Sequence, residues 1–143
     1  MRSVPDIILL TGNARYTITL DPSSWLFDDR KFDLDTYFEE PHDLDSPPRK
    51  YKKRDLLKEP YTFAVPLKPF LDNAEPLPDV VKLVIKTKDG KELDIPLETA
   101  KTGILSFTKD GKFLTEDGPA HFYYGDGSNK ENPITDIAQL IVR

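Results

Sequence analysis

His121 is the residue in this sequence whose side chain is best suited to proton exchange or to contact with an anion. It stands in the stretch GPAHFYYGDGSNKENP, residues 118–133, directly before Phe122, Tyr123 and Tyr124. A histidine can donate to an anion or exchange a proton near neutral pH. The ordinary alternative is that His121 is a strand residue with no ligand, and the sequence leaves both interpretations open.

The neighbouring Gly125-Asp126-Gly127 completes neither of the phosphate-loop motifs, and no amphipathic helix follows it to offer an N-terminus to a phosphate. We therefore interpret GDGSNKENP as a long turn. Oxygen-rich stretches at Asp33 and Asp126 lack the ligand spacing of an EF-hand calcium loop. The two histidines, His42 and His121, are too few and too far apart for a recognisable zinc site. We expect no metal site and no bound cofactor.

Composition excludes further classes of function. The chain of 143 residues has no cysteine, which removes disulfides, thiolate metal sites and thiol nucleophiles. No G-x-S-x-G elbow supports a serine hydrolase. A net charge of −5 makes general nucleic-acid binding an unlikely role. No apolar run is long enough to cross a bilayer, so we expect no membrane association and a cytoplasmic location.

One segment combines prolines with dense charge. Residues 41–60 hold four prolines and the run RKYKKR but little periodicity, and we predict a mobile charged loop there within a single domain spanning residues 1–143. Trypsin is then expected to cut first among Lys50 to Arg54. The acidic residues before this run compensate most of its charge, so it is not assigned to a polyanion.

Strand patterns dominate the rest of the chain. Apolar residues alternate on both sides of Asp89-Gly90, which predicts a β-hairpin, because Asp-Gly tolerates the positive φ of a tight turn. Two short strands are expected within residues 6–20, and a closing strand at 134–142 in which Ile137 faces opposite to Leu140 and Val142. The proline-rich residues 61–78 are predicted to be extended and poorly paired, and residues 99–108 fit a helix or a strand. The predicted class is α+β and β-rich, with mixed and antiparallel strands and one to three short helices.

The order of these motifs is similar to a known family. The hairpin from Val84 to Leu97 with its DG turn, then DGKFL, GPAHFYY and the closing ITDIAQLIV resemble the C-terminal half of the oxidoreductase molybdopterin-binding domain, which has the sulfite-oxidase-like fold. The opening LTGNARYTITLDPSSW is similar to the first strand of that family. The resemblance covers residues 78–142 and implies the same fold here.

The chain departs from this family where the chemistry would lie. Metal-binding members of the family hold molybdenum with a cysteine, which this chain lacks. His121 stands where the family commonly carries a basic residue that contacts the pterin phosphate, and a histidine is a weaker anion contact than an arginine fork. The resemblance therefore implies a conserved fold without its catalytic centre.

Two functions remain open at this point. The first is a non-catalytic binding or interaction module for a protein partner or a small anionic ligand, with Tyr123 and Tyr124 among its contacts. The second is a pterin-binding or anion-binding domain of the oxidoreductase type that lacks the thiolate ligand. There His121 and one of three basic residues would contact the anion. These basic residues are Arg15, Arg30 and Lys130.

Overall fold

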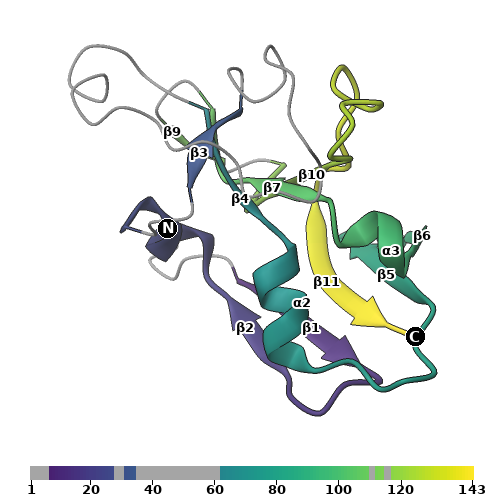
Figure 1. The fold of residues 1–143 in the computed structure, drawn as a ribbon. Coiled ribbons are helices and arrows are strands. Elements are labelled where there is room, and N and C mark those ends of the chain that lie inside the picture. The colour runs from purple at the N-terminus through teal and green to yellow at the C-terminus, as the bar shows by residue number, and fades with distance from the viewer. Residues whose placement is uncertain (1–6, 28–30, 35–61, 110–111, 115–116) are drawn as a thin grey trace.

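The fold is α+β and rich in strands, which confirms the class expected from the sequence (Figure 1). The structure, a computed structural model, describes residues 7–27, 31–34, 62–109, 112–114 and 117–143. The loop expected at residues 41–60 and the candidate Arg30 lie outside these ranges. None of the helices within them has the length and apolar character that a membrane span requires.

A five-stranded sheet brings the two ends of the described chain together. The strand nearest the N-terminus runs parallel to the strand nearest the C-terminus, with Leu10 opposite Leu140. All other neighbouring strands in this sheet are antiparallel. In Figure 1 the yellow C-terminal strand lies between strands from the first and the middle parts of the chain. The strands in spatial order are β2 Ile18–Leu20, β1 Ile8–Gly12, β11 Ile137–Val142, β5 Lys82–Thr87 and β6 Glu92–Pro96.

A second sheet of four short antiparallel strands carries His121. One row of residues crosses all four strands, because His121 pairs with Ser106, Ser106 with Ala64, and Ala64 with Phe32. These four residues therefore share one face of the sheet. The strands in spatial order are β10 His121–Tyr123, β7 Ile104–Ser106, β4 Phe63–Pro66 and β3 Phe32–Asp33, and a separate pair consists of β8 Thr108–Lys109 and β9 Lys112–Phe113.

Short helices cover parts of these sheets. The 3-10 helix η1 spans Pro22–Phe27, α2 spans Lys68–Ala74 and α3 spans Leu97–Ala100. Helix α2 contacts β1 and β2 and buries Phe70 and Leu71, while α3 contacts β5 and β6. Pro69 stands in the first turn of α2, where its missing N–H costs no hydrogen bond.

The main core is aromatic at its centre. Trp25 of η1 stacks on Phe70 of α2 at 5.3 Å and meets Phe107 edge-on at 5.6 Å. Burying a large apolar side chain of this kind contributes roughly 1.5–3 kcal/mol. The four-stranded sheet separates this core from a second, smaller cluster of buried apolar residues. This cluster consists of Phe32, Leu34, Ala64 and Ile104.

The predicted hairpin is confirmed as β5 and β6, joined by a turn at Asp89-Gly90 in which Gly90 has φ of 91°. The burial pattern of β5 differs from the strict alternation that the sequence predicted. Leu83, Val84 and Ile85 are all fully buried, although only one face of the sheet belongs to the main core.

The predicted alternation of the closing strand is wrong at its start. The pairing of β11 with β5 shifts between Ile137 and Gln139, so that Ala138 is an additional residue in β11. This β-bulge moves Ile137 onto the same core as Leu140 and Val142, and all three are fully buried. A strict period of two cannot reveal such an insertion.

The prediction for residues 61–78 is also wrong. Strand β4 is an inner strand of the four-stranded sheet, and α2 follows it directly. Pro66 is tolerated because it is the last residue of β4. Residues 99–108, for which helix and strand both remained open, contain the end of α3 followed by β7 and the start of β8.

Candidate functional site

His121 begins β10 and is buried, with 8% of its surface exposed. Its Nε2 atom lies 3.1 Å from Oδ1 of Asp117, whose side chain is half exposed. The distance suits an ion pair, but the directions do not suit a hydrogen bond, and in the described part of the chain this buried nitrogen has no hydrogen-bond partner. The interpretation of His121 as a strand residue is confirmed, and a ligand-contacting role for it stays a prediction.

The carboxylate beside His121 limits what the imidazole can bind. An anion placed at Nε2 would also face Asp117, and two negative charges at this spacing repel each other. A protonated imidazole would attract the anion, but Asp117 already compensates that charge. The pair is therefore better suited to internal charge compensation than to holding a phosphate.

Neither hydroxyl group near this pair is arranged as a nucleophile. Ser106, opposite His121, has its Oγ 3.3 Å from the carbonyl oxygen of Phe63 and 3.2 Å from that of Thr108. Oγ1 of Thr108 accepts the Phe63 N–H at 2.8 Å. A catalytic base would have to bond the hydroxyl of its nucleophile, and within the described ranges Nε2 of His121 makes no hydrogen bond.

The stretch GDGSNKENP forms the turn between β10 and β11, as the sequence predicted. Asn129 holds it, because its Oδ1 accepts the Tyr124 N–H at 2.8 Å and its Nδ2 donates to the Phe122 carbonyl at 3.2 Å. The backbone N–H and the hydroxyl of Ser128 bond the carboxylate of Asp126 and lower its pKa. The Gly-Asp-Gly motif thus stabilises a turn.

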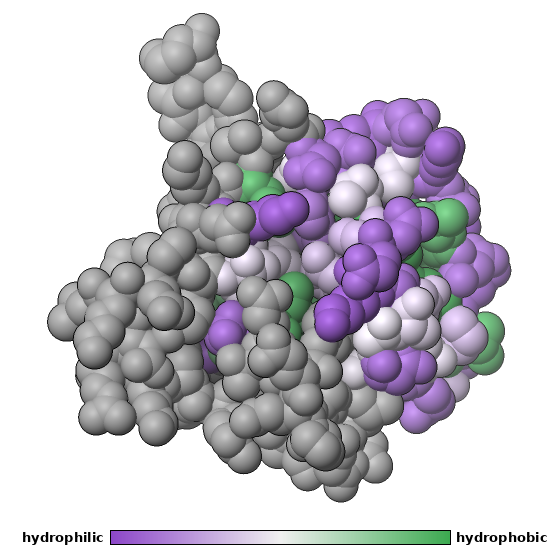
Figure 2. Space-filling view, turned by 90° about the horizontal axis from the view of Figure 1, so that it is seen from above, coloured by the Kyte–Doolittle hydropathy of each residue, from purple (hydrophilic) through white to green (hydrophobic). Residues whose placement is uncertain are grey.

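Seen from above, the described surface is mostly hydrophilic, with scattered apolar residues (Figure 2).

Tyr124 lines an open polar cleft of about 270 Å³ between this turn and α3. Its ring meets Phe122 edge-on at 5.3 Å, so it is anchored in the core rather than freely exposed. The cleft also has two carboxylates, but that of Asp126 bonds its own turn and that of Glu98 pairs with Lys101 at 3.2 Å. Its polar groups are largely satisfied within the chain.

The other candidates from the sequence do not form one site. Tyr123 packs against the smaller core cluster, and Lys130 is exposed in the turn after β10. Arg15 belongs to the connection between β1 and β2. This connection is at the bottom of Figure 1, whereas β10 is in the upper half. The side chain of Arg15 is 3.8 Å from Glu75. His121 and Arg15 are therefore not positioned to share one ligand.

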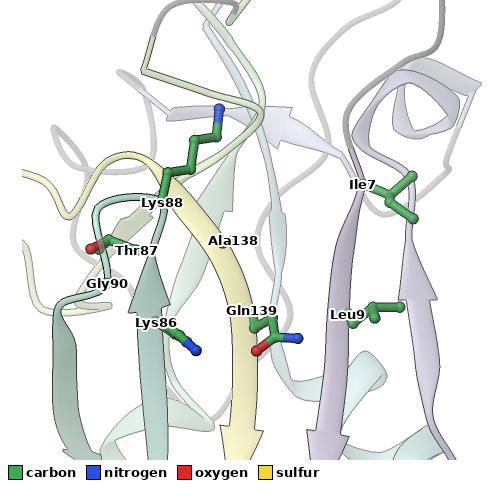
Figure 3. A pocket seen from close by; sticks show the side chains of 8 residues that line it. All are labelled: Ile7, Leu9, Lys86, Thr87, Lys88, Gly90, Ala138 and Gln139. Atoms are coloured by element: carbon green, nitrogen blue, oxygen red, sulfur yellow. The ribbon is translucent and has the colours of Figure 1, made fainter.

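A pocket of about 420 Å³ lies on one face of the five-stranded sheet, and none of these candidates lines it. Figure 3 shows it over β5, β11 and β1, with the side chains of Lys86 and Gln139 on the same side. Sequence reasoning missed this pocket. The alternation of lysines on β5 was visible, but the bulge at Ala138, which lines the pocket, was not. Its walls include Ile7, Leu9, Lys86, Lys88, Ala138 and Gln139.

The described residues contain no group of three or more histidine, aspartate or glutamate side chains that could hold a metal ion. Taken together, the fold is a β-rich α+β fold in which a buried histidine pairs with a carboxylate and one face of the larger sheet carries a pocket with basic and apolar walls.

The comparisons with known proteins relate this fold to part of an enzyme. No protein-family model matches the chain, and no curated protein matches it. Among solved structures, it is similar to the sulfane dehydrogenase SoxCD from Paracoccus pantotrophus, with a TM-score of 0.58 and 11% sequence identity. The match covers 96% of this chain and 38% of that chain. At this identity the likeness shows a distant relationship of fold alone, and the chain spans little more than a third of its relative.

Proposed function

We propose that this chain is a non-catalytic binding module on a molybdopterin-domain-like fold. The fold relationship to part of a sulfane dehydrogenase supports the scaffold. The pocket on the sheet face supports the binding role, because its walls combine apolar groups with amide and ammonium donors, which recognise a ligand without reacting with it. This pocket is the observation that carries the proposal.

The residues do not fit a molybdenum and pterin group held as in the resembled family. That family supplies a thiolate, and this sequence has no cysteine. The residue at the position of the family's basic contact, His121, has a carboxylate 3.1 Å away, which disfavours a pterin phosphate. No reaction step is therefore assigned to such a group.

The alternative function is a pterin-binding or anion-binding oxidoreductase-type domain without a thiolate ligand. Elemental analysis and the visible spectrum of the purified full chain separate the two. We expect a colourless protein with molybdenum well below one atom per chain, even after expression with added molybdate. Stoichiometric molybdenum or a pterin chromophore that remains bound through gel filtration would overturn the proposal and favour the alternative.

A further inference from the structure

We propose that the pocket over β1, β11 and β5 binds a small organic anion that has an apolar body, with the anionic group at Lys86 and the body against Ile7 and Leu9. This inference rests on the proposed binding function and names its ligand class. Three features of the described residues support it: the bulge in β11, the register of the strands, and the pairing of the nearby charges.

The bulge residue lines the hollow. Ala138 is the additional residue of β11, and it presents only a methyl group where a longer side chain would fill the space. Gly90 lines the same pocket from the β5 to β6 turn, and an added Cβ there would meet no atom within 4 Å. The volume of about 420 Å³ is therefore open to a ligand, and it falls within the range of roughly 300–1,000 Å³ typical of small-molecule sites.

The strand register places three chemically different side chains of the pocket in one row across the sheet. Gln139 pairs with Lys86 on one side and with Leu9 on the other, so an ammonium, an amide and an isobutyl group follow one another across the sheet. Figure 3 shows these three side chains over neighbouring strands. An anion at Lys86 can accept from the Gln139 amide, while its apolar part covers Leu9 and the half-exposed Ile7.

The charges around the pocket favour an anion over a cation. Within the described ranges, no carboxylate forms an ion pair with Lys86. Glu92, which is opposite Lys86 on β6, pairs with Arg143 at 3.6 Å. Asp89 bonds the Thr87 hydroxyl and the backbone N–H of Lys91, so its negative charge is directed into its own turn. Lys86 therefore adds positive charge beside an apolar wall.

The test is a titration of the isotopically labelled full chain, followed by the backbone amide signals. Sodium octanoate is the probe, octan-1-ol has the apolar body without the charge, and inorganic phosphate has the charge without the body. We expect saturable shifts with octanoate at Lys86 to Gly90 and at Ile137 to Gln139, and much weaker effects with the two partial probes. Equal binding of octanol would overturn the anionic part of the proposal, and equal binding of phosphate would overturn the apolar part.

Variants locate the site independently. The charge reversal Lys86→Glu is expected to weaken octanoate binding by about tenfold, since it replaces the attraction of an exposed charge with a repulsion. Ala138→Leu fills the hollow without changing charge and is expected to abolish binding. Lys109→Glu, at an exposed lysine of β8, is the matched control and should bind as the parent does. Melting curves verify that each variant is folded. If Ala138→Leu does not fold, the double variant Lys86→Met with Gln139→Leu replaces it, because it removes the two polar groups of the pocket.

Failure here and failure of the proposed function give different results. Absence of octanoate shifts in a metal-free, colourless protein would reject this ligand class, while the proposed function, which does not depend on the chemical class of the ligand, would stand. Stoichiometric molybdenum would reject the module whatever the titration shows. Octanoate shifts that survive both Ala138→Leu and Lys86→Glu would place the ligand elsewhere and overturn the inference.

Discussion

Nε2 of His121 lies 3.1 Å from Oδ1 of Asp117 and yet makes no hydrogen bond within the described part of the chain. The main chain of Asp117 is also engaged, because its carbonyl oxygen accepts the Asp136 N–H at 2.8 Å. The pair therefore links the start of β10 to the segment that leads into β11. Its position indicates a structural role more directly than a chemical one.

Replacing this histidine tests whether the imidazole contributes to this link or whether the main-chain bond between Asp117 and Asp136 is sufficient. His121→Phe removes a buried nitrogen that has no hydrogen-bond partner and leaves Asp117 half exposed and hydrated. Such a change is nearly neutral or stabilising, so we expect the free energy of unfolding to change by less than about 1 kcal/mol or to rise. Urea denaturation measures it, with Asp117→Asn as the control. A loss above about 2 kcal/mol would show that the imidazole makes a favourable contact that this geometry does not predict.

Asp126 should titrate below its ordinary pKa of 3.8, because the backbone N–H and then the hydroxyl of Ser128 stabilise its carboxylate. A lowered folded-state pKa stabilises the fold above the unfolded-state value, and this contribution is lost as the pH falls through the folded-state pKa. Ser128→Ala removes the hydroxyl but keeps the N–H, so the pKa of Asp126 should rise only part of the way. Carboxyl NMR titration of both proteins measures the midpoints, and identical midpoints would contradict the assigned cause.

Gly12 and Gly90 both have positive φ, at 110° and 91°, but differ in their surroundings. A Cβ on Gly12 would collide with the backbone of Val142, whereas one on Gly90 would meet nothing within 4 Å. We expect Gly12→Ala to cost more than about 2 kcal/mol and Gly90→Ala only about 1 kcal/mol, from backbone strain alone. Chemical denaturation of the two variants compares them directly. Equal losses would mean that the contact between β1 and β11 yields easily.

Deleting Ala138 tests the bulge. Without this residue, either Ile137 turns away from the core or the register of β11 against β5 shifts. Exposing a fully buried isoleucine costs roughly 1.5–3 kcal/mol, so we expect a loss of at least that size in a thermal or urea melt. Ala138→Ser keeps the bulge and should have little effect. A deletion variant as stable as the parent would show that the strand accommodates either register.

Much of the fold was accessible from local pattern. The β5 and β6 hairpin was predicted because its two strands are adjacent in sequence and Asp89-Gly90 suits a tight turn. The turn at Gly125 to Pro133 was predicted for the same reason. Helix α2 was missed because four prolines in residues 61–78 suggested an extended chain. However, Pro66 is the last residue of a strand and Pro69 stands in the first turn of a helix, the two places where a missing N–H is harmless.

The candidate site was less accessible. Sequence reasoning selected His121 but had no means of assigning Asp117 as its neighbour, since their contact depends on the path of a non-helical segment. The sheet-face pocket needs Lys86 and Gln139 from two strands distant in sequence, together with the bulge at Ala138. Neither the pairing of these strands nor the bulge is visible in the periodicity of the sequence.

Side-chain period and turn chemistry, which act between neighbours in the chain, were sufficient to establish a β-rich α+β protein with a hairpin, a long polar turn and no thiol chemistry. The parallel pairing of β1 with β11, the bulge and the row from Lys86 to Leu9 arise only in three dimensions. They depend on contacts between residues far apart in sequence, whose energies are set by mutual burial and strand register and therefore leave no local signature.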